Sequence, residues 1–389
     1  MISGKLVFPA IERVVYGEPA ASALNDEAQR QDANRVFLMV SRTMNRTTDE
    51  VAKVREALGG RYAGLFDEMP SHTPRDAVLA AIRAARAERA DLIVTFGGGS
   101  LTDAGKLVRL GLQHGIDDLD GFDAFRSRVG PDGVRPSPNY AGPSVHQVSI
   151  PTTLSAGDFN ASAGCTDLRT HEKHGFRHPQ LVPRTIILDP APTVHTPMWV
   201  WLSTGIRALD HAAEGLCSQF SSPVSDMYNA QALKLLASAL PRVKQNPRDL
   251  DARLDCQIAT WLSIVGRHGS VKMGASHALG HALGGTCGVP HGYTSCVILP
   301  HVLRYNRSVN AERQALVAAA MGHPGDDAAD VITAFLGKLG LPRSLREVNV
   351  TRERFDAIIE HTMHDEWLHA NPRKITSREQ VLEILEAAA

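Results

Sequence analysis

The stretch DLIVTFGGGSLTDAGK, residues 91–106, decides the fold that this sequence predicts. Its apolar opening is typical of a strand that is buried on both faces. Three glycines and Ser100 follow, and the small and polar residues after them indicate the first turn of a helix. A strand that runs through glycines into a helix predicts a parallel sheet, with a turn that a bulky polar group can approach closely.

Further strand and helix patterns lie on both sides of this stretch. Residues 74–90, opened by Pro74 and rich in alanine and arginine, predict a helix directly before the strand. Short runs of strand-forming residues recur at 35–40, 147–150 and 185–188. Strands that alternate with helices predict a parallel sheet that is covered by helices on both faces.

The pattern changes near Asp189-Pro190. Beyond this point helical periodicity dominates, and the clearest helices are expected at 203–221, 225–240 and 251–268. A short helix is also expected at 379–389. We therefore predict two domains, an α/β domain with a parallel sheet over residues 1–190 and an all-α domain over residues 191–389.

Composition narrows the class of protein. The chain has 389 residues, of which 43% are hydrophobic and 21% charged, and its formal net charge is −1. These values are ordinary for a globular protein, and no basic stripe favours nucleic acid or an anionic membrane as a partner.

No apolar run is long enough to cross a membrane. The N-terminus lacks the layout of a signal peptide, and the five widely spaced cysteines contain no CxxC pair. Both features favour a reducing cytoplasm.

Two loops that follow predicted strands are candidate binding elements. Gly97-Gly98-Gly99-Ser100 matches neither GxGxxG nor the phosphate-loop pattern GxxxxGK[ST]. An ordinary tight turn accounts for three glycines taken alone, but their place between a buried strand and a helix favours phosphate binding. The second loop, PTTLSAGD at residues 151–158, offers hydroxyl groups for hydrogen bonds, although turn chemistry explains it equally well alone.

Histidines cluster in the second half of the chain. His277 and His281 are four residues apart, so they share one face of a helix, and His291 follows in a PHG triplet. His211 lies upstream in the helical stretch GIRALDHAAEG, residues 205–215. Each histidine alone is more often structural, but several convergent imidazoles are typical of a metal site or a proton relay. The sequence contains no HExxH, which excludes the usual zinc protease.

Together these motifs resemble those of the iron-containing alcohol dehydrogenase superfamily, including its maleylacetate reductase branch. The matching motifs are GGGS at 97–100 with Asp103 and Lys106, PTT at 151–153, His277 with His281, and PHG at 290–292. The resemblance covers most of the chain in the right order. It implies a dehydroquinate synthase-like fold, in which the α/β domain binds a dinucleotide and the all-α domain holds a metal and the substrate.

The resemblance also implies roles for single residues. NAD or NADP would be held by Ser41, Gly97, Gly98, Gly99, Ser100, Asp103, Thr152, Thr153 and Lys173. A divalent iron or zinc ion would be bound by His211, His277 and His291, and His281 would relay a proton. The turn Ser41-Arg42-Thr43 lacks the acidic residue that favours NAD, so Arg42 and Arg46 would tolerate the 2′-phosphate of NADP.

Arg207 departs from the family pattern. It stands four residues before His211, where the family has its aspartate ligand, and a guanidinium group cannot ligate a cation and repels it. Asp210 directly precedes His211 and is turned about 100° away around a helix, so it is a poor replacement. Residues 9–17 resemble the N-terminal segment of maleylacetate reductases. Membership of that branch would imply catalysis without a metal. The PHG triplet, in contrast, is closer to the alcohol dehydrogenases. Arg207 could bind a substrate carboxylate or a developing oxyanion.

These considerations favour hydride transfer between a nicotinamide and a small alcohol, aldehyde or keto acid, with His281 and Arg207 as catalytic residues. The alternative within the oxidoreductases is metal-independent reduction of maleylacetate to 3-oxoadipate. A dehydroquinate synthase-like lyase, from another class, would consume no NAD(P)H and would need a basic phosphate site. A binding protein with a decayed site is a third possibility, which the retained histidines disfavour. The expected assembly is a homodimer that acts on a small molecule.

Overall fold

The computed structural model describes residues 7–127, 137–267 and 271–389. The chain forms two compact units. One runs from Pro9 to Thr196, and the other from Pro197 to Ala389 together with Val7 and Phe8. The division therefore falls between Thr196 and Pro197, shortly after the expected limit at residue 190.

The first unit is built on a six-stranded sheet. Across the sheet the strands are β1 (Arg13–Tyr16), β8 (Thr185–Leu188), β5 (His146–Pro151), β4 (Leu92–Gly97), β2 (Val36–Val40) and β3 (Tyr62–Phe66). Neighbouring strands are paired in parallel. The carboxyl ends of the strands therefore meet at the same edge of the sheet.

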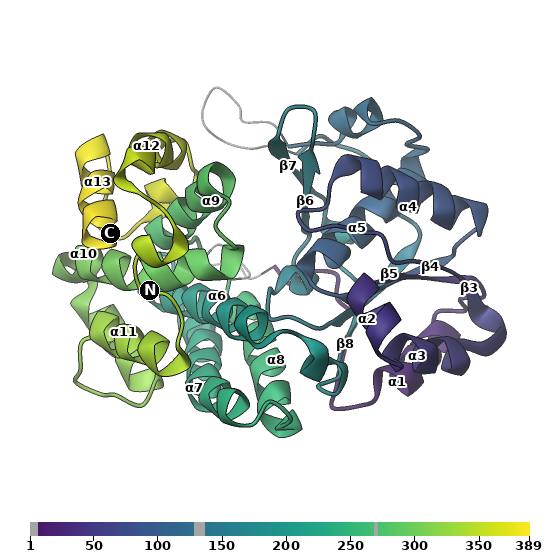
Figure 1. Cartoon of the computed structure of the whole chain (residues 1–389), viewed down its shortest axis with the longest axis horizontal. Helices are drawn as coiled ribbons and strands as arrows, with labels where there is room; N and C mark the ends of the chain where they lie inside the picture. The colour runs from purple at the N-terminus through teal and green to yellow at the C-terminus, as the bar shows by residue number, and fades with distance from the viewer. Residues whose placement is uncertain (1–6, 128–136, 268–270) are drawn as a thin grey trace. The chain divides into compact units, whose positions relative to one another are not determined.

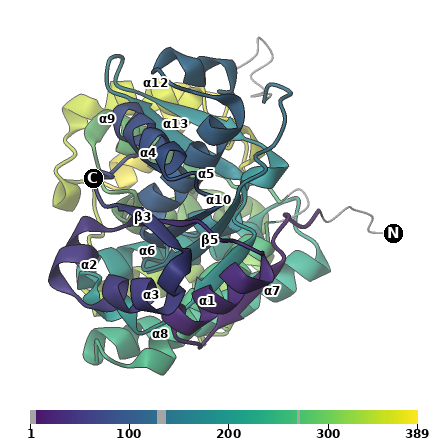
Figure 2. The same ribbon diagram turned by 90° about the vertical axis from the view of Figure 1, so that its right-hand side faces the viewer.

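Helices cover both faces of this sheet (Figures 1 and 2). Side chains alternate along each strand, so Phe37 and Met39 pack under one layer of helices, and Val36 and Leu38 pack under the other. The first layer consists of α4 (Arg75–Ala87) and α5 (Gly99–His114); the second consists of α1 (Ala20–Arg30), α2 (Arg42–Thr47) and α3 (Glu50–Leu58).

An antiparallel hairpin was not foreseen from the sequence. Its strands are β6 (Ser162–Asp167) and β7 (Glu172–Arg177), which pair along their full length. The segments SAGCTD and EKHGFR contain few large apolar residues, so their periodicity gave no strand signal. This hairpin carries Lys173, one of the residues predicted to bind the cofactor.

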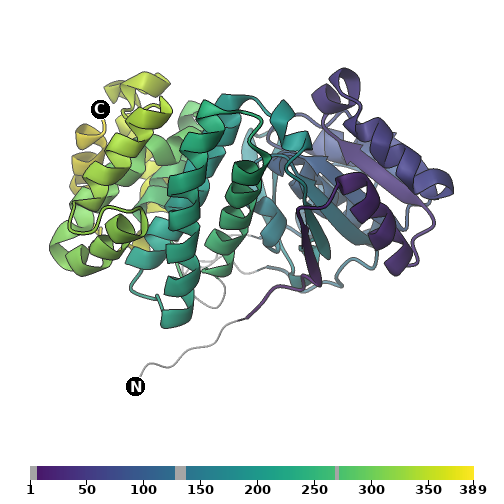
Figure 3. The same cartoon turned by 90° about the horizontal axis from the view of Figure 1, so that it is seen from below.

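The second unit contains helices and no strand among its described residues (Figure 3). Its α-helices are α6 (Met198–Cys217), α7 (Pro223–Gln245), α8 (Leu250–Val265), α9 (Ala275–Cys287), α10 (His291–Ala320), α11 (Ala328–Leu339), α12 (Phe355–Met363) and α13 (Arg378–Ala387). Residues 205–217 of α6 are all buried, because α7, α8 and α10 pack around this helix. None of the helices in the described part of the chain has the length and apolar character to cross a bilayer.

Candidate functional site

The carboxyl ends of three strands bring together several residues predicted to bind the cofactor. The chain passes from β2 to β3 on one side of β2 and returns to β4 on the other side. A reversal of this kind opens a crevice outside the strand ends, where α/β proteins bind nucleotides. The Ser41 N–H donates to the Phe96 carbonyl at 3.1 Å, and the Thr152 N–H donates to the Gly97 carbonyl at 2.9 Å. These bonds tie the loops after β2, β4 and β5 into one platform.

The glycine loop leaves room for a group that approaches its backbone. A Cβ on Gly98 would lie 3.3 Å from Cγ2 of Thr153, and one on Gly99 would lie 2.8 Å from Oγ of Ser155. The hydroxyls of Thr153 and Ser155 are buried without a hydrogen-bond partner. α5 begins at Gly99 without a side-chain cap, so the positive end of its dipole faces this loop. These residues fit a dinucleotide pyrophosphate, and Ser155 adds a hydroxyl that was not singled out from the sequence.

Asp103 and Lys173 meet at the β6–β7 hairpin. The Asp103 carboxylate accepts the Gly164 N–H at 3.0 Å. The Lys173 side chain lies across Gly164, where a Cβ would collide with it. Lys106, in contrast, is fully buried and donates to the Gly157 carbonyl at 2.7 Å. Lys106 therefore anchors α5 to the chain before the hairpin, and the cofactor roles of Asp103 and Lys173 stay predictions.

A strained turn after β3 holds Ser100. His72 and Thr73 have φ angles of 66° and 53°, which cost non-glycine residues about 1–3 kcal/mol each. The His72 N–H donates to Ser100 Oγ at 3.2 Å, and the Thr73 hydroxyl donates to the Ser100 carbonyl at 3.0 Å. The same turn binds the hairpin, because the Thr166 N–H donates to the Thr73 carbonyl at 3.1 Å. Since Ser100 Oγ accepts from His72, the hydroxyl proton of Ser100 remains available to a phosphate oxygen.

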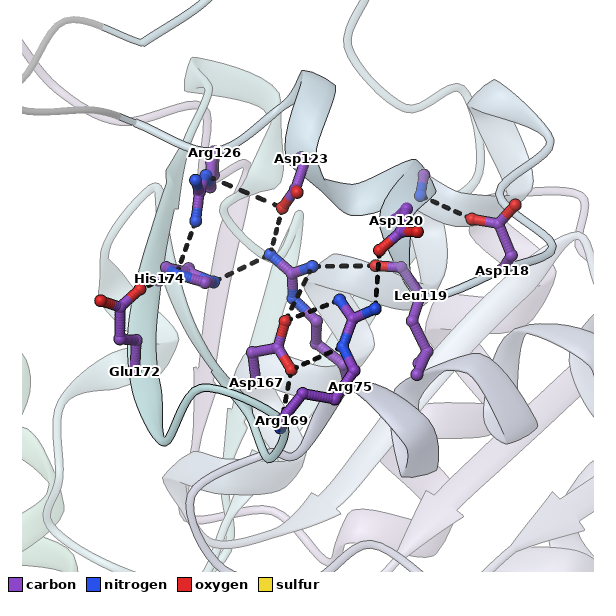
Figure 4. A network of polar contacts seen from close by, with 11 residues as sticks. Arg75, Asp118, Leu119, Asp120, Asp123, Arg126, Asp167, Arg169, Glu172 and His174 are labelled. Atoms are coloured by element: carbon purple, nitrogen blue, oxygen red, sulfur yellow. Dashed lines mark hydrogen bonds and ion pairs between the residues drawn. The ribbon is translucent and has the colours of Figure 1, made fainter.

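Arg75 fixes the hairpin to the start of α4 (Figure 4). Its buried guanidinium donates to the Leu119 carbonyl at 2.8 Å and to Asp123 at 2.7 Å, and lies 2.8 Å from Nδ1 of His174. The carboxylate of Asp167 lies 3.4 Å away. Because Asp167 ends β6 and His174 lies on β7, one guanidinium holds both strands of the hairpin.

The two arginines after β2 are already ion-paired. Arg42 lies 3.5 Å from Glu68, and Arg46 lies 3.7 Å from Asp67, both of which follow β3. The arginine side chains are 52% and 62% exposed, so these pairs are weak. A 2′-phosphate would compete with the two carboxylates, and the accommodation of NADP stays a prediction.

In the helical unit, three ionisable residues share one face of α6. Arg207, Asp210 and Glu214 are three and four residues apart, and all are buried. The Arg207 guanidinium donates to Ser295 Oγ at 3.0 Å and lies 3.4 Å from Asp210. Gly280 of α9 lies beside this guanidinium, since a Cβ at Gly280 would be 3.5 Å from Nη1, which is an ordinary van der Waals distance.

The two carboxyl groups of this face have several hydrogen-bond partners. Asp210 Oδ2 accepts the hydroxyls of Ser276 at 3.0 Å and Ser295 at 2.6 Å. Glu214 accepts the Ser276 N–H at 2.9 Å and lies 2.6 Å from Nδ1 of His277. In residues 7–127, 137–267 and 271–389, the metal-ligating atoms that converge within 4.8 Å belong to Asp210, Glu214 and His277. This group differs from the predicted trio of histidines.

Burial sets the charges around α6. Burial, and then the charge of the neighbouring Asp210, raises the pKa of Glu214 to about 8. Burial, followed by the positive charges of Arg207 and Arg267, lowers the pKa values of His211 and His277 well below the ordinary range. Glu214 is therefore protonated and both imidazoles are uncharged at neutral pH.

A metal ion fits this donor set poorly. Nδ1 of His211 and Nε2 of His277 are buried without a hydrogen-bond partner, and the two ring centroids are 5.0 Å apart. Buried polar atoms without a partner in the protein are candidates for contact with a bound molecule. Arg207 places a fixed positive charge at the position where the resemblance implies an aspartate ligand, and the nearby carboxyl oxygens already accept hydroxyl and N–H groups. An oxygen that carries partial or full negative charge suits the site better than a divalent cation does.

His281 and His291 form a second pair of imidazoles. Their rings are stacked with centroids 6.1 Å apart and planes 8° apart. The His281 side chain is 41% exposed, and its Nδ1 lies 2.8 Å from Oδ2 of Asp365. The sequence did not reveal Asp365, because 84 residues separate it from its partner and no motif links the two.

Comparison with known proteins places this geometry in a family. Residues 11–190 match the model "Iron-containing alcohol dehydrogenase", and residues 201–389 match "Fe-containing alcohol dehydrogenase family, C-terminal". A dehydrogenase of Gibberella moniliformis is 33% identical over 97% of this chain and 96% of that protein. Maleylacetate reductase 1 of Cupriavidus pinatubonensis is 30% identical over 94% of this chain and 92% of that protein.

Solved structures agree with the fold. The crystal structure of maleylacetate reductase from Agrobacterium tumefaciens has a TM-score of 0.83 at 27% identity, and covers 100% of this chain and 98% of that chain. The predicted fold class, a parallel α/β domain with a mostly helical domain of the dehydroquinate synthase type, is confirmed. The chain therefore belongs to the iron-containing alcohol dehydrogenase family of oxidoreductases.

Proposed function

We propose that the chain catalyses hydride transfer between NAD or NADP and the carbonyl of a small keto acid, and maleylacetate is the first substrate to test. The buried Arg207 guanidinium beside the unpartnered nitrogens of His211 and His277 carries this proposal. A fixed cation among neutral imidazoles suits a carboxylate or a developing oxyanion. Relatives named maleylacetate reductase, at 28–30% identity, support the choice of substrate.

The residues of this chain would have the following roles in cofactor binding and catalysis. A reduced nicotinamide, when bound, supplies the hydride. The loop at residues 97–100 and the hydroxyl of Thr153 hold the pyrophosphate, with Ser100 donating its free proton. Arg207 stabilises negative charge as it develops on the carbonyl oxygen. His281 then donates a proton to that oxygen, which completes the alcohol.

Metal-assisted oxidation of an alcohol, or reduction of the corresponding aldehyde, is the second candidate, favoured by the PHG triplet at residues 290–292. The test is metal analysis by mass spectrometry, on untagged protein purified without chelators, alongside NAD(P)H oxidation with maleylacetate and with propanal. We expect turnover of maleylacetate by protein with far less than one metal per chain. Arg207→Asp should lose this activity and gain affinity for zinc. About one iron or zinc per wild-type chain, with preference for propanal, would overturn the proposal.

A further inference from the structure

His281 lies in a setting that fixes its orientation. Its Nδ1 is 2.8 Å from the Asp365 carboxylate, and its ring is stacked against His291. An ionised carboxylate accepts hydrogen bonds and donates none, so the imidazole must carry its proton on Nδ1. The other nitrogen, Nε2, is then the atom that can exchange a proton with a bound molecule. The His281 side chain is 41% exposed, so solvent can restore this proton.

We propose that Asp365 is the positioning residue of the proton relay, holding His281 in the form protonated on Nδ1; this rests on the function proposed above. In reduction, a bound reduced nicotinamide would supply the hydride that forms the C–H bond at the carbonyl carbon. The carbonyl π electrons move to oxygen, and this oxygen takes the proton from Nε2 of the His281 imidazolium. Nδ1–H stays bound to Asp365 throughout, and solvent reprotonates Nε2.

Asp365 is itself held in place. Its second oxygen, Oδ1, accepts the Trp367 N–H at 2.9 Å, which prevents the carboxylate from turning away. The same loop is fixed by the fully buried Asn371, which accepts the N–H of Ala275 at 3.1 Å. Ala275 begins α9, the helix that carries His281, so loop and helix are tied at a second point. A carboxylate fixed in this way imposes one orientation on its histidine, as in Ser-His-Asp catalysis.

The first experiment reads the tautomer directly. Nitrogen NMR spectra of full-length protein with ¹⁵N-labelled histidine are recorded at about pH 9, where an ordinary imidazole is neutral. The His281 signals are assigned by their loss in His281→Ala. We expect the Nδ1–H form in the wild type and in Glu366→Gln, a matched control at an exposed neighbouring carboxylate. Asp365→Asn should shift this signal towards an averaged or Nε2–H form. An Nε2–H form in the wild type would overturn the proposal without reference to any substrate.

The second experiment is kinetic, with NADH and maleylacetate as probes. Asp365→Asn should lower kcat about 10- to 100-fold and leave the KM for NADH within about twofold. In a His281→Ala background the same substitution should have little further effect, because the two residues act as a unit. Equal losses in both backgrounds would assign Asp365 a structural role only. If His281→Ala leaves turnover unchanged, the proposed role of His281 as proton relay is wrong. The NMR experiment tests the effect of Asp365 on the His281 tautomer independently of that outcome.

Discussion

Glu214→Gln offers a quantitative test of the charges around α6. The native state favours the neutral acid, because burial and Asp210 raise the pKa of Glu214 to about 8. Between its ordinary pKa of 4.5 and about 8, the unfolded chain has released this proton and the native state still holds it. The stabilisation is therefore complete below 4.5 and declines as the pH rises to about 8. At about 1.4 kcal/mol per pKa unit the upper limit is about 5 kcal/mol, and we expect roughly 2–4 because Asp210 shares the titration.

The assay is urea denaturation of wild type, Glu214→Gln and the control Glu366→Gln at pH 5 and pH 8. Glutamine cannot ionise, so this variant should lose most of the decline between the two pH values. At pH 5 it should be about 1 kcal/mol less stable than wild type, because one acceptor for a backbone N–H is lost. A wild-type decline that persists unchanged in Glu214→Gln would refute the assignment of a buried neutral acid at this position.

Three further predictions concern the α/β unit. Gly99→Ala brings a methyl group to 2.8 Å from Ser155 Oγ, so the KM for NADH should rise at least about tenfold in steady-state assays with a smaller change in kcat. Glu68→Gln frees Arg42 from its ion pair and should raise the ratio of kcat/KM for NADPH to that for NADH a fewfold; an unchanged ratio would separate Arg42 from the 2′-phosphate. Arg75→Met removes the hydrogen bonds of a buried guanidinium to the Leu119 carbonyl and Asp123, and its ion pair with Asp167. It should lower the free energy of unfolding by about 3–5 kcal/mol in urea titrations, whereas a loss below about 1 kcal/mol would contradict its anchoring role.

Elements with strong local signals were predicted well. The apolar run before Gly97 became β4, the alanine-rich stretch became α4, and the predicted strand at 185–188 is β8. In each case the pattern of apolar residues along the chain reflects burial directly. β6 and β7 escaped prediction because their order comes from partners distant in sequence, such as the guanidinium of Arg75, rather than from an apolar face.

In the candidate site, too, residues close together in the sequence were predictable and residues brought together only by folding were not. Histidine spacing and the glycine loop were visible because their residues are close in sequence. Asp210 and Glu214 also carried a signal in the sequence, since carboxylates four residues apart share a helix face with Arg207. Asp365 had no local signal, because its pairing with His281 arises only when α9 and α12 pack together.

The turn at His72 and Thr73 also gives the molecule a built-in reporter. The amide protons of His72 and Thr166 are hydrogen-bonded outside the sheet ladder, one to Ser100 Oγ and the other to the Thr73 carbonyl. The rate at which these two amide protons exchange with deuterium therefore measures how often the hydrogen bonds of this turn to Ser100 and to the hairpin open. A nucleotide that accepts a hydrogen bond from the Ser100 hydroxyl should slow exchange at both amides together, so two backbone positions can record cofactor occupancy independently of any substrate.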